Sequence, residues 1–186
     1  MTPDNDSKHV EKYVMKVVLL GDGHVGKTSL RHQYLGEQLP TTYMATIGAD
    51  FAIKTLMIDG VEVKFNIWDL AGQPRFKEVR SMFFQGTNGA MFVYDLTNPE
   101  SLTNLRQWKE ELLANCTAKD VPAIVLGNKV DLVSEVDVNE AKKIAEEIAP
   151  GTPHLLTSAL TGENVDLAFK SIGRRMLTFI DSSTLY

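Results

Sequence analysis

The sequence predicts an α/β domain in which helices cover both faces of a mostly parallel sheet. Apolar segments of strand length alternate with segments of helical period, and the chain contains no internal repeat or low-complexity linker. Its 186 residues are close to the usual size of one domain. We therefore expect one domain over residues 13–181, preceded by a flexible lead-in at 1–12 and followed by a short tail at 182–186.

Three apolar runs account for the expected centre of the sheet. They occupy residues 14–20, 90–95 and 123–126 and contain almost no polar residues. Such runs are typical of parallel strands that are covered on both faces. We expect these three to be the central strands.

A hairpin is expected between the first and second of these strands. Segments 51–58 and 61–69 flank Asp59-Gly60, a dipeptide that favours a tight turn because both positions can adopt positive φ. In the second segment apolar and polar residues alternate, so one face is buried and the other is largely solvated. This antiparallel pair should lie near the edge of the sheet.

Three later helices are predicted by the period of their apolar residues. Asn98 followed by Pro99 is typical of a helix start, and Asp137 with Glu140 resembles a capping box. The apolar stripes should pack on the sheet. They consist of Leu102, Leu105, Trp108 and Leu112, then Val138, Ala141, Ile144, Ala145 and Ile148, and then Val165, Ala168, Phe169, Ile172, Met176 and Phe179.

The chemistry begins at positions 21–28, which read Gly-Asp-Gly-His-Val-Gly-Lys-Thr between the first strand and a helical segment. Glycines let a backbone bend closely around phosphates, and N–H groups at a helix N-terminus point toward an anion. Lys27 can reach terminal phosphates as a point charge, and the Thr28 hydroxyl is a hard oxygen suited to Mg²⁺. The residues expected around the phosphates are Gly21, Gly23, His24 (through its backbone N–H), Val25, Gly26, Lys27 and Thr28. This loop alone indicates only a nucleoside triphosphate.

A second motif, Asn-Lys-Val-Asp at positions 128–131, follows a buried strand, where α/β sheets bind their ligands. The Asp131 carboxylate can accept two parallel hydrogen bonds from guanine N1–H and N2–H₂, a donor pair that adenine lacks. Each motif residue also has an ordinary reading, such as a loop lysine, a capping threonine, a turn asparagine or a solvated aspartate. Their joint order argues against that reading.

With Asp-Leu-Ala-Gly-Gln at 69–73 and Thr-Ser-Ala at 157–159 added, the chain resembles the Ras superfamily of small GTPases. The resemblance extends from about Tyr13 to Ile180, and segments 46–51 and 68–76 resemble the Rab branch most. It implies a P-loop NTPase fold with a six-stranded, mostly parallel sheet, one antiparallel edge pair and helices on both faces. The implied activity is slow hydrolysis of GTP to GDP with Mg²⁺ by a molecular switch.

The resemblance also assigns roles to individual residues. Thr28, Thr46 and Asp69 would hold Mg²⁺, while Gln73 would position the attacking water and Lys27 would neutralise phosphate charge. Further nucleotide contacts are implied for Ser29, Tyr43, Thr46, Gly72, Asn128, Lys129, Asp131, Ser158, Ala159 and Leu160. The switch segments would be 41–46 and 70–80, with activating, exchange and effector proteins as partners.

An aromatic triad of Phe51, Trp68 and Phe83 matches the effector-binding surface of Rab-like proteins. The alternative is that Phe51 and Phe83 are ordinary core residues and that Trp68 merely lies on a half-exposed strand. For Gln73 the alternative is an exposed loop residue without a function. The sequence leaves these alternatives open.

Three positions depart from the pattern of the superfamily. Leu39 stands where most relatives place an aromatic ring against the guanine base, and Leu160 stands where lysine is usual. We expect weaker nucleotide retention for this reason. Pro74 restricts the backbone of Gln73, which could help or harm the catalytic geometry.

Composition narrows the remaining possibilities. The net charge of −5 and the scattered Lys and Arg residues do not favour nucleic acid as a partner. The single cysteine, Cys116, fits a reducing compartment, so we expect a cytoplasmic monomer. The last eight residues contain no cysteine for prenylation, so we expect no lipid anchor on this chain. Membrane recruitment then depends on partners or on a tail lost by truncation.

Three functional classes remain open. The chain could be a GTPase switch, a GTP-binding scaffold that barely hydrolyses, or another P-loop enzyme such as a kinase. Leu39, Leu160 and Pro74 favour the scaffold. Gly23 and Gln73, however, are both suited to hydrolysis. A kinase would need an acceptor pocket and a lid, for which the chain leaves little sequence.

Overall fold

The structure, a computed structural model, describes residues 11–39, 46–118, 120–151 and 154–183. Within these residues six strands form one sheet in the order β2-β3-β1-β4-β5-β6. Only β2 and β3 pair antiparallel, whereas the other neighbours are parallel. The predicted fold class and the antiparallel edge pair are therefore confirmed. The strands are β1 (Lys12–Leu20), β2 (Ala49–Ile58), β3 (Val61–Leu70), β4 (Gly89–Asp95), β5 (Ala123–Asn128) and β6 (His154–Thr157).

The hairpin between β2 and β3 turns as predicted. Asp59 and Gly60 both have positive φ, 50° and 89°, which matches a turn whose twist suits the flanking strands. Val63, Phe65 and Ile67 of β3 are fully buried, while Lys64 between them is exposed. Burial on one face fixes the register of this pair, because a slip by one residue would expose all three.

The helices follow the strands in the order that the alternation predicts. They are α1 (Lys27–Leu35), α2 (Lys77–Ser81), α3 (Pro99–Thr103), α4 (Leu105–Asn115), α5 (Val138–Ile148) and α6 (Val165–Ser183), with a 3₁₀ turn, η1 (Pro74–Phe76), before α2. The Asn98 and Asp137 side chains accept hydrogen bonds from backbone N–H groups of the first turns, which confirms both caps. The first predicted helix is divided in two at Asn104, whose ψ of −15° departs from the helical value.

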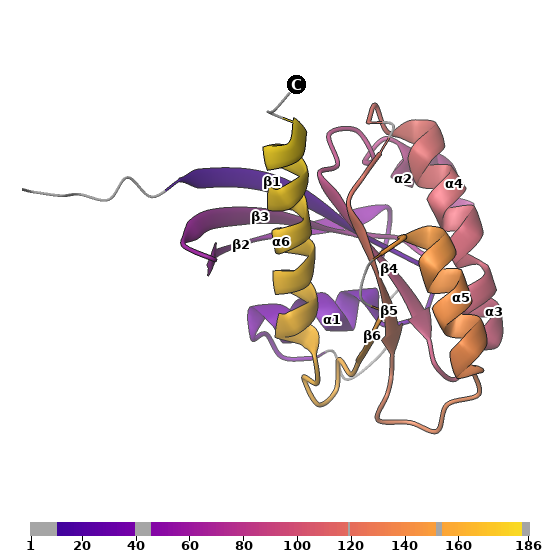
Figure 1. Cartoon of the computed structure of the whole chain (residues 1–186). Helices are drawn as coiled ribbons and strands as arrows, with labels where there is room; N and C mark the ends of the chain where they lie inside the picture. The colour runs from indigo at the N-terminus through magenta and orange to yellow at the C-terminus, as the bar shows by residue number, and fades with distance from the viewer. Residues whose placement is uncertain (1–10, 40–45, 119, 152–153, 184–186) are drawn as a thin grey trace, which may run out of the picture.

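Alternate residues of the central strands face two separate cores. In β1, Val18 and Leu20 pack in the core covered by α4 and α5, whereas Val17 and Leu19 pack in the core covered by α1 and α6. Figure 1 shows α1 and α6 on one side of the sheet and α3, α4 and α5 on the other. Helices thus cover both faces, as predicted for parallel strands.

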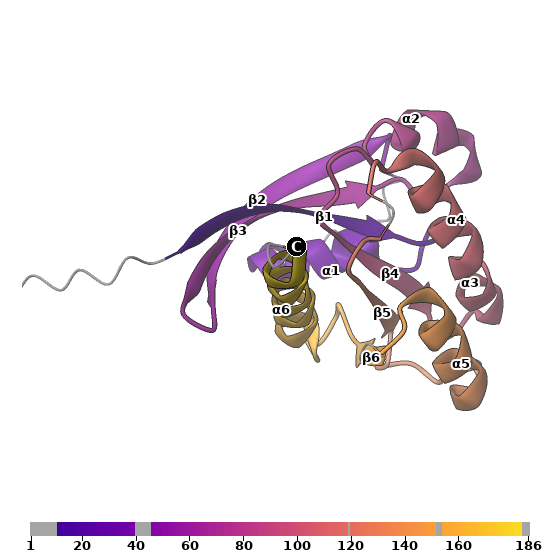
Figure 2. The ribbon, with the colours of Figure 1, turned by 45° about the horizontal axis from the view of Figure 1, so that its top comes forward.

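The two faces are not covered along the whole sheet. Figure 2 shows β1, β2 and β3 extending beyond the helices as a twisted wing. Val14 near the start of β1 is 66% exposed for this reason, although it lies in a run that the sequence predicts to be central.

The carboxyl ends of β1, β3, β5 and β6 lead into all four predicted motifs. The segments that follow these strands begin near residues 21, 70, 128 and 158, at the same edge of the sheet. This is the edge at which an α/β sheet binds its ligands.

The expected domain boundaries at residues 13 and 181 differ slightly from the observed start of β1 and end of α6. Lys12 already belongs to β1, so the last residue of the expected lead-in is part of the sheet, and α6 continues to Ser183. In the described part of the chain, no helix has the length and apolar character needed to cross a membrane.

Candidate nucleotide-binding site

The loop from Gly21 to Gly26 joins β1 to α1. Gly26 has a φ of 97°, and a Cβ at this position would lie 2.3 Å from Nδ2 of Asn128. Glycine is therefore required both by the backbone conformation and by the close approach of the Asn128 side chain. His24 also has a positive φ of 68°, a conformation in which histidine is less unfavourable than most side chains.

Lys27 begins α1 and lies almost completely inside the loop. Its Nζ donates hydrogen bonds to the carbonyl oxygens of Gly21 at 2.7 Å and Asp22 at 2.8 Å. Burial lowers the pKa of Lys27 to about 8, although the charges of Asp69 and Asp22 act in the opposite direction. A cation held there at the start of a helix is suited to an anionic ligand.

Three predicted magnesium ligands converge beside Lys27. The Thr28 hydroxyl donates to Oδ2 of Asp69, and the Thr46 hydroxyl lies 3.2 Å from Thr28 Oγ1 and 3.4 Å from Asp69 Oδ2. These side chains come from α1, from the segment before β2 and from β3. The resemblance to small GTPases implied this group, although its members are up to 41 residues apart.

The donor set fits Mg²⁺. It offers two hydroxyls and one carboxylate, the hard oxygen ligands that this ion prefers. Asp69 is fully buried, its Oδ1 has no hydrogen-bond partner, and burial raises the pKa of its carboxyl. A buried carboxylate with a free oxygen is stabilised by a cation.

Asn128 fastens the two ends of the site together. Its Nδ2 donates to the carbonyl oxygen of Val25 at 2.9 Å, and its Oδ1 accepts from Thr157 Oγ1 and from the backbone N–H of Ala159, both at 3.2 Å. The side chain is buried, so these partners satisfy groups that could not reach water. Direct contact of Asn128 with a base stays a prediction.

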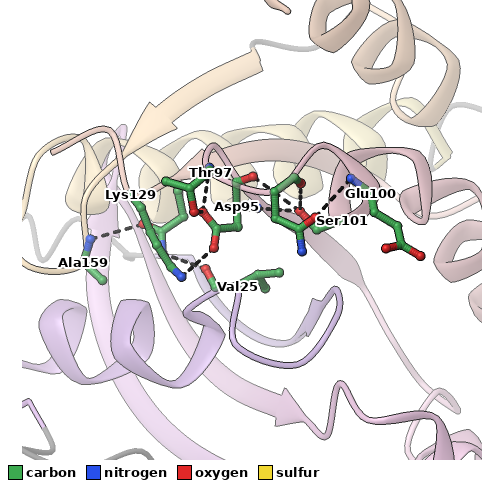
Figure 3. Close-up of polar contacts among 9 residues, drawn as sticks. Val25, Asp95, Thr97, Glu100, Ser101, Lys129 and Ala159 are labelled. Carbon is green, nitrogen blue, oxygen red and sulfur yellow. Dashed lines mark hydrogen bonds and ion pairs between the residues drawn. The ribbon is translucent and has the colours of Figure 1, made fainter. Parts of the chain in front are cut away.

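Lys129 is held beside the same loop by a partner that the sequence did not suggest. Its Nζ donates to Oδ2 of Asp95 at 2.5 Å, and Figure 3 shows the two side chains pointing toward one another, with Val25 and Ala159 nearby. Asp95 ends β4 and also accepts from the backbone N–H and hydroxyl of Thr97. The pair fixes the orientation of Lys129, whose own φ is 71°.

Asp131 lies at the open end of the site. Its Oδ1 accepts a hydrogen bond from the Ser158 hydroxyl at 2.6 Å, and the side chain is otherwise exposed. Ser158 is itself buried and its Oγ also accepts from the backbone N–H groups of Leu160 and Thr161. Leu160 is 69% exposed, and its contact with a base stays a prediction.

Gly72 and Gln73 lie against the phosphate loop. A Cβ on Gly72 would lie 2.4 Å from the carbonyl group of Asp22, so only glycine allows this approach. A Cβ on Gly23 would lie 3.5 Å from Cγ of Gln73, which places the glutamine side chain beside the loop. Gln73 has φ −77° and ψ 138°, the extended conformation expected before Pro74.

The acidic side chain of Asp22 has a role that sequence reasoning missed. It accepts hydrogen bonds from Asn104 Nδ2 and from Trp108 Nε1, both at 2.8 Å. The spacing of four residues puts Asn104 and Trp108 on one face of a helix, but it does not identify their partner. The sequence pattern identifies Trp108 only as a member of an apolar stripe.

The aromatic triad forms one continuous cluster. The Trp68 ring centroid lies 5.3 Å from those of Phe51 and Phe83. Phe51 is 55% exposed, whereas Trp68 and Phe83 are half-buried and pack against the core, so the cluster is only partly exposed. Of the remaining predicted contacts, Ser29 follows Thr28 in α1, whereas Tyr43 lies outside the described residues.

Comparison with known proteins identifies the family of the chain. Residues 16–178 match the model of the Ras family. The Ras-related protein Rab-1D of Dictyostelium discoideum is 40% identical over 176 residues, which cover 94% of this chain and 82% of that protein. The Ypt/Rab-type GTPase YPT7 of Saccharomyces cerevisiae is 41% identical, covering 90% of this chain and 83% of its own. The Ras-related protein Rab7 of Drosophila melanogaster is 40% identical, covering 90% and 82%. The chain therefore belongs to the Ras family and is a Rab-like small GTPase.

Proposed function

We propose that this protein binds GTP and GDP with Mg²⁺, hydrolyses GTP slowly and acts as a Rab-like switch that recruits effectors in its GTP state. The observation that carries the proposal is the convergence of Thr28, Thr46 and Asp69 beside the buried ammonium of Lys27. A second recognition group, Asp131, lies at the other end of the same edge. This arrangement is suited to a guanine nucleotide extended between the two.

Phosphoryl transfer requires mainly positioning and charge neutralisation. Lys27 would balance negative charge on the terminal phosphates, and Gln73 would orient the attacking water from its place beside Gly23. Thr28, Thr46 and Asp69 would hold Mg²⁺, which would neutralise charge on the β- and γ-phosphates when bound. The protein therefore contributes geometry and electrostatics instead of a covalent intermediate.

Slow unaided turnover is expected because Arg80 and Arg31 are engaged elsewhere and Arg75 lies over the ring of Phe76, 4.8 Å from its centroid. Arg80 is buried against Glu111 and two backbone carbonyls, and Arg31 pairs with Asp50 at 2.8 Å. An arginine supplied by an activating protein would accelerate hydrolysis by about 10³- to 10⁵-fold.

The switch segments would be 41–46 and 70–80, ordered by the γ-phosphate and the metal and released after hydrolysis. Residues 41–45 lie outside the described chain. The aromatic surface formed by Phe51, Trp68 and Phe83 would receive the effector. The single cysteine is our reason to expect that the protein is located in the cytoplasm. Partners would then mediate any recruitment to membranes.

The experiment that tests the function has two parts. First, dissociation constants for GTP and ATP are measured with Mg²⁺ by competition against a fluorescent nucleotide. Second, phosphate release is followed in a single turnover from protein preloaded with GTP. Selective GTP binding with slow release supports the switch, selective binding without release supports a scaffold, and equal affinity for ATP contradicts the proposal.

Replacing Pro74 with glutamate should slow intrinsic hydrolysis by about two- to fivefold. Proline holds Gln73 in its extended conformation, and glutamate would let this residue visit the α region. The dissociation constant for GTP should hardly change, because the phosphate and base contacts lie elsewhere. Single-turnover rates of the two proteins measure this, and identical rates would exclude a role for Pro74.

Restoring the usual covers of the base should slow nucleotide release. We expect Leu39→Phe and Leu160→Lys each to reduce the GDP dissociation rate by about three- to tenfold, through ring stacking and a cationic cover respectively. Leu113→Lys serves as the control, because Leu113 is also an exposed leucine and lies on α4. Labelled GDP is chased with unlabelled nucleotide, and an already very slow rate that neither change alters would reject the idea.

A further inference from the structure

Arg80 is a buried charge in a segment whose other side chains are mostly exposed. It lies in α2, where only 4% of the residue is accessible to solvent, while Lys77, Glu78 and Val79 are exposed. A guanidinium is costly to bury unless its donors are satisfied. The hydrogen-bond partners of the Arg80 guanidinium therefore show which parts of the structure it holds together.

Two of its nitrogens make a forked ion pair with Glu111 of α4. Nε donates to Oε1 at 2.6 Å and Nη2 donates to Oε2 at 2.8 Å. The Glu111 side chain is only 8% exposed, so water competes little for either partner. This geometry is available to arginine and not to lysine, because a planar fork matches the carboxylate.

The third nitrogen holds the backbone that carries Gln73. Nη1 donates to the carbonyl oxygen of Gln73 at 2.9 Å and to that of Ala71 at 3.2 Å. These carbonyls lie on either side of Gly72, the residue packed against Asp22. One side chain thus fixes both ends of the tripeptide that is expected to face the γ-phosphate.

Helix α4 connects this contact to the phosphate loop. The Arg80 guanidinium lies 4.2 Å from the centroid of the Trp108 ring, and Trp108 Nε1 donates to Asp22. Asn104 Nδ2 donates to the other oxygen of Asp22. Glu111, Trp108 and Asn104 therefore present one face of the α3–α4 segment to Arg80 and to the loop together.

We propose that Arg80 is a positioning residue for hydrolysis, which places Gln73 relative to the phosphate loop by anchoring the 71–73 backbone to Glu111. Arg80 does not touch the reacting atoms. The proposal rests on the proposed function, since it requires that Gln73 orients the attacking water. An error of about 1 Å in such an alignment lowers a rate by about 100-fold.

A purely structural ion pair would give a different result. Arg80→Lys keeps the charge, but one ammonium on a flexible stem cannot serve Glu111 and both carbonyls in the same geometry. We expect single-turnover hydrolysis to fall by about 10- to 100-fold in this variant. The dissociation constant for GTP should stay within about threefold, because an interaction that matters in the transition state alone leaves ground-state binding unchanged.

A charge-swapped variant separates positioning from stability. In R80E/E111R the ion pair can form again, but the glutamate introduced in place of Arg80 has no donor for the carbonyls of Ala71 and Gln73. We expect the midpoint of thermal unfolding to recover relative to R80E alone, while hydrolysis stays slow. Arg106→Lys is the matched control. Arg106 lies on α4, as Glu111 does, and pairs with Glu147 of α5, but its side chain is 44% exposed. The hydrolysis rate of this variant should equal that of the wild type.

The results can overturn the proposal in three ways. These are a wild-type hydrolysis rate in R80K, a loss of GTP affinity in R80K as large as the loss of rate, and recovery of hydrolysis together with stability in the swapped variant.

Gln73→Ala in the same assay separates the two proposals. If Gln73→Ala hydrolyses at the wild-type rate, the role assigned to Gln73 fails. If it is slow while R80K is normal, the role of Arg80 alone fails.

Discussion

Replacing Asp131 with asparagine is expected to lower GTP affinity by about 10³- to 10⁵-fold and to make xanthosine triphosphate the preferred ligand. The carboxylate is expected to accept hydrogen bonds from N1–H and the 2-amino group of guanine. Asparagine keeps one acceptor and replaces the other with a donor, which matches the 2-oxo group of xanthine. Ser158 supports this change from guanine to xanthine, because its hydroxyl can donate to the amide oxygen of the asparagine as it donates to Oδ1 of Asp131.

Competition binding with GTP, xanthosine triphosphate and ATP measures this change. Asp137→Asn is the control, because Asp137 caps α5 and asparagine is an equally good cap. That variant should keep wild-type selectivity. Unchanged preference for GTP in Asp131→Asn would show that another group reads the base.

Replacing Gly26 with alanine is the second large effect that we expect. The added methyl would lie 2.3 Å from Nδ2 of Asn128, and the φ of 97° would itself be strained. The phosphate loop would have to move away from the side chain that joins it to Thr157 and Ala159. We expect the free energy of unfolding to fall by about 2–4 kcal/mol and GTP affinity to fall by about 100-fold.

Gly36 at the other end of α1 provides the control. It also has a positive φ, 75°, but a Cβ there would meet no atom within 4 Å. Gly36→Ala should therefore cost only the backbone strain, about 1–2 kcal/mol, without an effect on GTP affinity. Denaturant unfolding and nucleotide titration of both variants give the comparison, and equal effects on affinity would mean that strain and not the Asn128 contact is responsible.

The sequence predicted best the features that depend on local pattern. The runs of β1, β4 and β5, the hairpin at Asp59-Gly60 and the caps at Asn98 and Asp137 all follow from neighbouring residues, and all are confirmed. The short strand β6 was not located, because a segment of four residues is too short to show a period that distinguishes a strand from a loop.

Contacts between distant polar groups were beyond sequence reasoning. Nothing local indicates that Arg80 should meet Glu111 31 residues later, or that Lys129 should meet Asp95. Charged side chains are ordinarily exposed, so the burial of one by a specific partner can be seen only in the folded structure. The magnesium group was reached through its resemblance to a known pattern and not through spacing.

The placement of the two tryptophans makes each one an optical reporter of a different event. Trp108 is 4% exposed, donates to the phosphate loop through Asp22 and lies under the cation of Arg80. Trp68 lies instead between the rings of Phe51 and Phe83. Because indole emission depends on nearby charge and on water, the emission of Trp108 should follow events at the phosphates. The emission of Trp68 should follow the docking of a partner, so single-tryptophan variants would resolve the two without a label.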